Sequence, residues 1–301
     1  MKVLITGGSG FVGRYLHAHC SESGDDVVTI DHSGADPVDI TDRDAIRHSL
    51  SHHRPEVVYH LAAISHVGEG WDDPTAVLRV NVEGTAHVLN AAHDFGVRRV
   101  IVIGSAEEYG QVDERDLPLR EDAPLRPSSP YGVSKIAASY LALQAYLAYG
   151  LEVVRVRAFG HTGPGQSDRF LVPALARRIA VAEYEDLDEI RVGSIEPVRD
   201  LSDVRDVVRA YRLLAQHGTP GETYNVCSGT GVSVREVTDR LVAAAKRPLR
   251  ITVDPDLVRP VEVPRLVGDA TRLRTDTGWS PQFTLDETLT AVLEHARTAL
   301  G

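Results

Sequence analysis

Short Val- and Ile-rich runs alternate with helix-period segments through the first half of the chain, and this alternation constrains the fold more than any other feature. The runs are nearly continuous in apolar character, as expected of strands covered on both faces. They are KVLIT (2–6), DVVTID (26–31), EVVYHLA (56–62), RVIVIG (99–104) and LEVVRVRAF (151–159). Strand and helix alternating in this way predict an α/β fold with a doubly wound parallel sheet.

The alternation weakens after about residue 160, where Pro, Gly and charged residues separate shorter segments. This change predicts a main domain over residues 1–159 and a smaller C-terminal α/β lobe over residues 160–301. The segment RDLSDVRDVVRAYRLLA reads as a return to the main domain, over about residues 196–216.

Charge and hydropathy exclude several classes of function. The chain has 32 Lys and Arg residues and 43 Asp and Glu residues, which gives a net charge of −11. This charge disfavours a nucleic-acid surface, which needs clustered basic residues. The apolar runs are too short to span a bilayer, and the N-terminus enters a strand without signal-peptide features. Cys20 and Cys227 are too few for a disulfide framework. We therefore expect a soluble cytoplasmic protein whose partner is a small molecule, not a nucleic acid or a membrane.

The sequence TGGSGFVG follows the first predicted strand and opens a helix near Phe11. Gly7, Gly10 and Gly13 let the backbone turn tightly and approach a pyrophosphate, which the free N–H groups of a helix N-terminus attract. We expect these glycines, with Phe11 and Val12, to bind the diphosphate of NAD in a Rossmann-type domain. A plain strand–turn–helix that binds nothing is the alternative.

Asp31 ends the second predicted strand. An acidic residue at that place accepts hydrogen bonds from the adenosine ribose and repels the extra phosphate of NADP, so NAD is favoured over NADP. Asp39 and Ile40 are candidates to flank the adenine. A helix cap from Asp39 or Thr41 is the alternative reading of that segment.

The segment SPYGVSK places Tyr131 and Lys135 four residues apart at the start of a predicted helix. That spacing puts both side chains on one face, where the ammonium group can lower the pKa of the phenol toward neutrality. Such a tyrosine can move a proton at a carbinol or carbonyl group. The same spacing also arises by chance, so the pair gains meaning only from the motifs around it.

Together these motifs carry a resemblance that runs over essentially the whole chain. TGGSGFVG, HLAAISHV (60–67), NVEGT (81–85), Ser105 and YGVSK resemble the extended short-chain dehydrogenases/reductases that act on nucleotide sugars. HTGPGQ (161–166), RDLSDVRDVVRAY (199–211), YNVCSG (224–229) and RPVEVPRLVGDATRLRTDTGW (259–279) resemble more narrowly the branch of GDP-mannose 4,6-dehydratase and GDP-4-keto-6-deoxymannose reductase.

The resemblance implies a role for each matching residue. Ser105 would hydrogen-bond the sugar O4, Tyr131 would move its proton, and Lys135 would hold the nicotinamide ribose. His60 would lie beside the cofactor diphosphate, with its ring in an ordinary buried role. The other implied cofactor contacts are Leu61, Ala62, Ala63, Asn81 and Tyr131. The implied substrate contacts are Ser105, His161, Arg199, Arg259 and Glu262, with a surface ion pair as the alternative for the two arginines and Glu262.

The stretch GSAEEYG (104–110) raises the question of a catalytic base. In the dehydratases that the chain resembles, a Glu two residues after the Ser removes the C5 proton once C4 is a ketone, and Glu107 falls on that position. Residues two apart on a strand share a face, so we expect Ser105 and Glu107 in one pocket and Glu108 solvated or structural. A carboxylate that merely bonds a loop is the alternative for Glu107.

The resemblance also sets the expected activity. We expect an enzyme of the NAD-dependent 4,6-dehydratase type with a GDP-hexose-like substrate. A 4-keto reductase or an epimerase is the alternative, and a non-catalytic dinucleotide-binding regulator the remote one. Gly70, Gly160 and Ser194 stand where the family often has Ser, Asn and Asn, which predicts a shifted or enlarged sugar pocket.

Two further expectations concern assembly and metals. The resemblance implies a homodimer through the helices after NVEGT and from YGVSK, with alanines 137, 138, 142, 145 and 148 permitting close approach. The histidines of HAHC (17–20) and SHH (51–53) lack a further ligand set nearby, so no metal site is expected.

Overall fold

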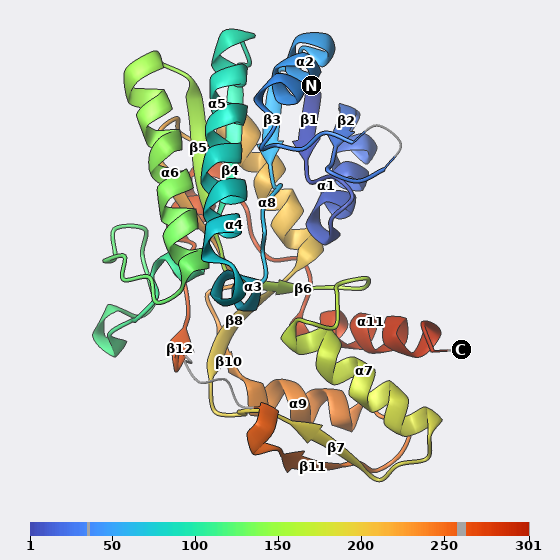
Figure 1. Ribbon diagram of the computed structural model, residues 1–301. Helices are drawn as coiled ribbons and strands as arrows, with labels where there is room; N and C mark the ends of the chain where they lie inside the picture. The colour runs from blue at the N-terminus through green and yellow to red at the C-terminus, as the bar shows by residue number, and fades with distance from the viewer. Residues whose placement is uncertain (35–36, 258–262, 301) are drawn as a thin grey trace.

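The computed structural model describes residues 1–34, 37–257 and 263–300, and it divides into a larger sheet domain and a smaller lobe (Figure 1). The predicted doubly wound sheet is confirmed: six strands pair in the order β2-β1-β3-β4-β5-β9, each parallel to its neighbours. The strands are β1 (Lys2–Thr6), β2 (Asp26–Ile30), β3 (Val57–His60), β4 (Arg99–Ser105), β5 (Glu152–Ala158) and β9 (Thr223–Val226).

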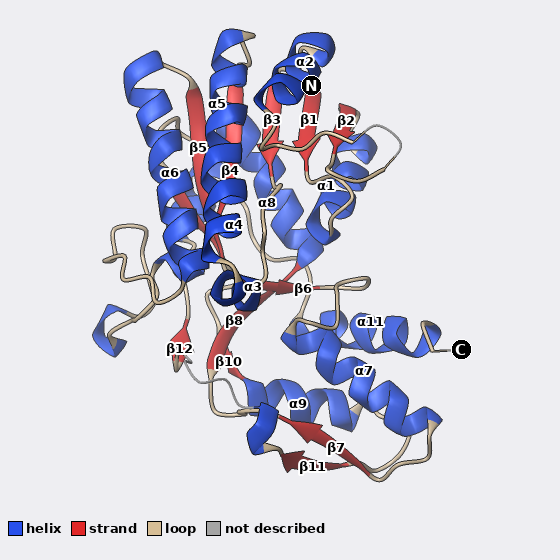
Figure 2. Ribbon diagram, viewed as in Figure 1, coloured by secondary structure: helices blue, strands red, loops and turns tan. Residues whose placement is uncertain are grey.

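Helices cover both faces of this sheet, as Figure 2 shows for α5 and α6 in front of the strands. One face packs against α1 (Phe11–Glu22) and α8 (Val204–His217), and its core includes Val3 and Ile5. The other face, which includes Leu4, packs against α2 (Arg43–His53), α5 (Gly84–Asp94) and α6 (Pro130–Tyr149). Successive strand residues thus enter opposite cores, which is why the runs are apolar throughout.

The helix expected after NVEGT begins before that motif, as three continuous pieces: α4 (Pro74–Leu78), a π-helical turn η1 (Arg79–Glu83) and α5. The returning segment is longer than the predicted range of about 196–216, because the sixth strand, β9, follows α8 and also belongs to the sheet. None of the described helices is long and apolar enough to cross a membrane.

The smaller lobe has its own core between α7 (Leu171–Tyr184), α9 (Val234–Ala243), α11 (Leu285–Thr298) and β7 (Glu189–Val192), which pairs with β11 (Arg250–Val253). The strand β8 (Val198–Asp203) pairs with β6 (Gly160–Thr162), β10 (Gly231–Ser233) and β12 (Arg265–Leu266) between the two parts. The short remaining elements are α3 (Val67–Asp72), η2 (Ala106–Glu108), η3 (Glu114–Asp116), η4 (Pro255–Leu257) and α10 (Thr271–Thr277).

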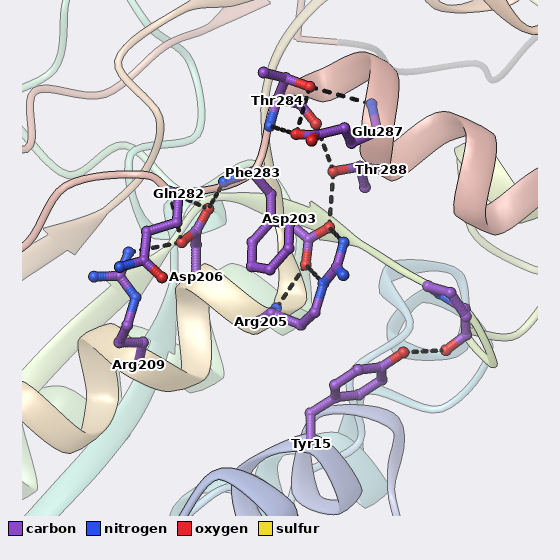
Figure 3. A network of polar contacts seen from close by, with 11 residues as sticks. Tyr15, Asp203, Arg205, Asp206, Arg209, Gln282, Phe283, Thr284, Glu287 and Thr288 are labelled. Carbon is purple, nitrogen blue, oxygen red and sulfur yellow. Dashed lines mark hydrogen bonds and ion pairs between the residues drawn. The ribbon is translucent and has the colours of Figure 1, made fainter.

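Two buried aspartates at the start of α8 join the domain to the lobe (Figure 3). Asp203 accepts hydrogen bonds from Arg205 at 2.7 and 2.8 Å and from Thr288 on α11 at 2.8 Å. Asp206 accepts from the backbone N–H groups of Gln282 and Phe283 at 2.9 to 3.0 Å. Because these carboxylates hold the chain entering α11, they fix the position of the lobe relative to the sheet.

Candidate active site

The glycine-rich turn after β1 has the geometry that a phosphate-binding loop needs. Gly7 has φ +74°, and a Cβ atom there would lie 2.8 Å from the backbone N of Ala62. A Cβ on Gly13 would lie 2.2 Å from the carbonyl oxygen of Gly7, so only glycine fits. Helix α1 begins after Gly10 without a side-chain cap, which leaves backbone N–H groups for an anion. The turn therefore fits a dinucleotide diphosphate.

Asp31 follows β2 at the rim of a cavity of about 410 Å³ that Arg14 and His17 also line. Its carboxylate accepts from the backbone N of Ser9 at 3.1 Å and lies 2.9 Å from Nδ1 of His32. Burial raises the pKa of Asp31, but the hydrogen bonds from Ser9, with smaller effects from His32 and Ser33, lower it, and the net shift is downward. Asp31 is thus an anion beside the phosphate turn.

The segment after β2 differs from expectation at its helix cap. Asp39 is exposed, and its carboxylate bonds the backbone N and hydroxyl of Thr41 at 2.8 and 2.9 Å. The cap of α2 is Asp42, not Asp39 or Thr41. The Ile40 side chain is buried against Gly84. A contact of Ile40 with an adenine would therefore involve its backbone.

The ends of β3 and η1 are tied together beside the glycine turn. Ala62 donates its N–H to Thr6 Oγ1 at 3.1 Å, and Leu61 and Ala63 flank it. The π-helical turn points the buried Asn81 at Ile64, whose backbone N and O it bonds at 2.8 and 3.1 Å. Asn81 thereby orders the loop after β3.

The His60 ring is buried between two hydroxyl groups, 2.8 Å from Thr6 Oγ1 and 2.9 Å from Thr85 Oγ1. Burial and the charge of Lys135 lower its pKa to about 3, so the ring is neutral at physiological pH. Its place is structural, as the sequence suggests.

Tyr131 and Lys135 lie buried in the first turns of α6, which Ser129 caps and Pro130 opens. Tyr131 hydrogen-bonds Ser105, the last residue of β4. Lys135 Nζ donates to the carbonyl of Ile103 at 2.9 Å. Helix α6 and strand β4 thus bring the predicted proton carrier, its lysine and the serine together.

The expected lowering of the Tyr131 pKa by Lys135 is not found. Burial raises the pKa of the phenol, the hydrogen bond from Ser105 lowers it, and the charges of Glu107 and Glu108 raise it further, with a net upward shift. The ammonium lies 5.8 Å from the centre of the Tyr131 ring and is bonded to a carbonyl oxygen. Burial also lowers the pKa of Lys135 to about 8, against the field of Glu108.

The strand argument for Glu107 is wrong, because Glu107 does not lie on a strand. Strand β4 ends at Ser105, and residues 106–108 form the 3-10 turn η2, so a period of two does not apply. Ser105 Oγ accepts from the Glu107 N–H at 3.1 Å and starts that turn. Glu107 is half-buried, and its charge acts on Tyr131.

Glu108 is not solvated: its exposed fraction is 0%. Its carboxylate accepts from the Ser105 N–H at 3.0 Å and from Arg157 Nε on β5 at 2.9 Å. Sequence reasoning missed this pair, although an arginine inside the apolar run LEVVRVRAF is a signal for a buried partner.

The predicted substrate residues lie around β6 and β8. The half-buried His161 is stacked on Phe11, and its Nδ1 is 2.9 Å from the carbonyl of Phe159. Arg199 donates to the carbonyls of Val198 and Val263 at 2.9 and 2.8 Å. Arg259 and Glu262 lie outside the described residues.

Two of the three positions that depart from the family pattern, Gly70 and Gly160, are tightly packed. A Cβ on Gly70 would lie 3.3 Å from the backbone N of Tyr131, and a Cβ on Gly160 would lie 2.9 Å from the carbonyl of Asp200.

A cavity of about 690 Å³ lies in the lobe between α7 and β7; its lining includes Arg177, Arg178, Glu189, Arg191 and Leu257. In the described ranges, no three His, Cys, Asp or Glu side chains gather as metal ligands do.

Comparison with known proteins gives one consistent picture. Residues 4–292 match the family described as GDP-mannose 4,6 dehydratase. A GDP-6-deoxy-D-mannose reductase of Pseudomonas aeruginosa is 36% identical over 296 residues, 97% of this chain and 96% of its own. The structure of RMD from Pseudomonas aeruginosa complexed with NADPH superposes with a TM-score of 0.91 at 35% identity, covering 99% of this chain and all of that one.

A third similar protein is UDP-glucose 4-epimerase of Thermus thermophilus in complex with NAD. Its TM-score is 0.89 at 28% identity, with 99% of this chain and 100% of that chain covered. The fold, the glycine turn and these relatives define the class: an extended short-chain dehydrogenase/reductase that uses a nicotinamide dinucleotide and acts on a nucleotide sugar. Within that class, the chain belongs to the GDP-mannose 4,6 dehydratase family.

Proposed function

We propose that the chain is a 4,6-dehydratase of a GDP-linked hexose. The observation that carries this proposal is the convergence of Glu107, Ser105 and Tyr131 at the end of β4. Ser105 is bonded to the phenol, and the Glu107 carboxylate is near enough to act on its ionisation. A dehydratase needs these two proton acceptors at neighbouring carbons of one sugar.

In the proposed reaction, Ser105 holds the C4 hydroxyl of the sugar and Tyr131 takes its proton. Glu107 then removes the C5 proton, which the new C4 ketone makes acidic, and the C6 hydroxyl leaves as water. Glu107 would pass its proton to the departing hydroxyl, and C5 would regain a proton in exchange for the one that Tyr131 took from O4. When bound, NAD would supply the redox chemistry by holding the hydride from C4 until it returns at C6, so the net change is the loss of one water. Lys135 donates to the Ile103 carbonyl beside this pair and would hold the nicotinamide ribose when the cofactor is bound.

We propose NAD rather than NADP as the cofactor. Asp31 is an anion after β2, where the adenosine ribose is proposed to bind, and its charge would repel a 2′-phosphate. Gly7, Gly10 and Gly13, with Phe11 and Val12, would hold the diphosphate at the start of α1.

The nucleotide of the substrate would lie along the lobe. Arg199 on β8 and Arg259 are the proposed diphosphate ligands, because a guanidinium group matches phosphate oxygens. Arg259 follows Leu257, which lines the 690 Å³ cavity between α7 and β7. We propose that cavity for the base, with Glu262 on the ribose and His161 near the sugar.

The second candidate is a GDP-4-keto-6-deoxy-hexose reductase. The 36% identity with the Pseudomonas aeruginosa reductase over nearly the full length of both chains favours it. In that reaction Tyr131 gives a proton to O4 of a 4-keto sugar, and Glu107 has no proton to remove from carbon.

Mass spectrometry of the protein with NAD and GDP-mannose separates these candidates. Loss of one water without accumulation of NADH, abolished in Glu107→Gln, supports the dehydratase. Turnover only of a 4-keto sugar with reduced cofactor, retained in Glu107→Gln, contradicts the dehydratase and establishes the reductase. An unchanged mass with an altered sugar would identify an epimerase instead.

We further propose that the chain acts as a homodimer in the cytoplasm. Val133, Tyr140 and Leu147 are 47%, 56% and 73% exposed, and their seven-residue spacing places them in one stripe on α6. Helix α5 stands beside α6 in Figure 1. Of the alanines expected to permit close approach, Ala138, Ala142 and Ala145 are buried within the domain. The dimer contact would therefore be formed by the exposed stripe of Val133, Tyr140 and Leu147.

Light scattering on Leu147→Glu tests the dimer. A monomer is expected, because the charge would lie within the apolar stripe. Tyr184→Glu, at a 76% exposed position on α7, is the matched control and should stay dimeric. A dimer in both variants would contradict the proposed interface.

A further inference from the structure

Glu108 is a buried carboxylate that the proposed reaction does not use, and it is bonded to the backbone of Ser105. Its Oε1 accepts from the Ser105 N–H at 3.0 Å, and its Oε2 accepts from Arg157 Nε at 2.9 Å. Gly104 makes room for it, since a Cβ at that position would lie 2.2 Å from Oε1. Both carboxylate oxygens therefore have hydrogen-bond partners, and only a glycine at position 104 leaves room for them.

Arg157 fixes the other side of this ion pair. Its Nη1 donates to the hydroxyl of Tyr109 at 3.0 Å and to the carbonyl of Glu121 at 2.8 Å. The Tyr109 hydroxyl in turn donates to Asn225 Oδ1 on β9 at 2.7 Å. The carboxylate of Glu108 is thus held from β4, β5 and β9 together, and its position is rigid.

The charge of Glu108 reaches both members of the proton-transfer pair. The charge of Glu108 raises the pKa of Lys135, against the effect of burial. Together with Glu107, it also raises the pKa of Tyr131. Three other titratable groups surround these residues: His60 on β3, Arg155 on β5 and Tyr211 on α8. His60 is neutral, since burial lowers its pKa to about 3, so Glu108 is the carboxylate that balances Lys135.

We propose that Glu108 is a positioning residue of the active site, which holds the turn that presents Ser105 to Tyr131 and supplies the fixed negative charge beside Lys135. The inference rests on the proposed roles of Tyr131 and Lys135. Glu108 acts through these neighbours, because its own oxygens are occupied by Ser105 and Arg157.

This role predicts a specific change in pH dependence. Glu108→Gln keeps the volume and an acceptor for the Ser105 N–H but removes one negative charge. Both the Tyr131 phenol and the Lys135 ammonium should then lose their protons more readily. The acidic and the alkaline limbs of the kcat/KM profile should both move to lower pH, which a purely structural loss would not cause.

The lysine content of the chain allows a test that needs no turnover. Its lysines are Lys2, Lys135 and Lys246, so an NMR titration of lysine labelled with ¹³C at Cε gives a resolved signal for Lys135. Lys135 should titrate near its pKa of about 8 in the wild type. In Glu108→Gln the midpoint should fall by roughly one pH unit, as the loss of a neighbouring buried opposite charge commonly produces.

The matched control is Glu121→Gln. Glu121 belongs to the same network, bonding the Asn225 N–H at 2.9 Å, but it is not among the groups that act on Lys135. Its variant should leave the Lys135 midpoint in place. A Lys135 midpoint within about 0.2 pH unit of wild type in folded Glu108→Gln would overturn the proposal.

If Glu108→Gln does not fold, the double variant Glu108→Gln/Arg157→Gln takes its place, because replacing both members of a buried ion pair is often tolerated. It should lower the Lys135 midpoint in the same direction, and an unchanged midpoint again overturns the proposal. A shifted midpoint in an enzyme whose Tyr131→Phe variant is fully active would leave the charge role intact and refute the proposed function alone.

Discussion

Tyr131 carries the sharpest expectation among single residues, because its phenol is buried and hydrogen-bonded to Ser105. Tyr131→Phe should lower kcat by roughly 10²- to 10⁴-fold, the usual contribution of a positioned proton donor or acceptor. NAD affinity should change little, and calorimetric titration alongside single-turnover kinetics checks both. A variant with wild-type kcat would remove Tyr131 from the reaction.

His60 predicts how stability depends on pH. Its pKa in the folded chain is about 3, below the value of about 6.5 for an unfolded histidine, so the unfolded chain binds the extra proton between these limits. Stability should therefore fall as pH drops below 6.5, by about 2 kcal/mol at pH 5 from this group alone.

Urea unfolding of wild type and His60→Gln at pH 7.5 and pH 5 measures that contribution. Gln can still hydrogen-bond Thr6 and Thr85, but it does not titrate. The His60→Gln variant should therefore lose less stability between pH 7.5 and pH 5 than the wild type does. Equal losses in the two proteins would show that His60 is protonated in the folded state.

At the scale of elements, the turn between β1 and α1 depends on glycine for space. A Cβ on Gly13 would meet the backbone oxygen of Gly7 at 2.2 Å, so Gly13→Ala must displace the turn. We expect a loss of about 1–3 kcal/mol of stability. NAD affinity should fall roughly ten- to hundredfold, since the phosphate would lose aligned N–H donors.

Gly24→Ala is the comparison for this prediction. Gly24 has φ +80°, and a Cβ placed on it would have no atom within 4 Å, so alanine there meets backbone strain without a clash. It should cost about 1 kcal/mol and leave NAD affinity unchanged. Thermal melting and calorimetric titration of both variants decide whether the steric argument for Gly13 holds.

For the whole molecule, the junction in Figure 3 determines how the lobe sits on the sheet domain. Asp206 is 1% exposed and accepts the N–H groups of Gln282 and Phe283. Asp206→Ala removes the carboxylate that these N–H groups and Arg209 bond. It should lower the free energy of unfolding by about 3 kcal/mol.

We expect the same variant to raise KM for the nucleotide sugar more than it changes NAD affinity, because the lobe carries the proposed substrate contacts. Asp206→Asn retains one acceptor and should show a smaller loss in urea unfolding. Equal stability of the alanine variant and the wild type would mean that the lobe is held by its apolar contacts alone.

The sequence by itself determined the architecture of the sheet domain. Its Val- and Ile-rich runs must be buried on both faces, and the glycines of TGGSGFVG can occupy a turn that no other residue fits. Both patterns can be read from neighbouring residues, although in the folded chain Gly7 is also confined by the distant Ala62. The Tyr131–Lys135 spacing likewise placed both side chains on one helical face without knowledge of what surrounds them.

Only the tertiary structure decided the surroundings of the site. The two-residue side-chain alternation of a strand could not show that β4 ends at Ser105. The turn that follows depends on Glu108, which bonds back to Ser105 and is held by Arg157 from β5. The upward pKa shift of Tyr131 follows from burial and two carboxylates, not from its sequence neighbour Lys135. Burial and charge are sums over segments distant in the chain, and so they appear only once the strands are side by side.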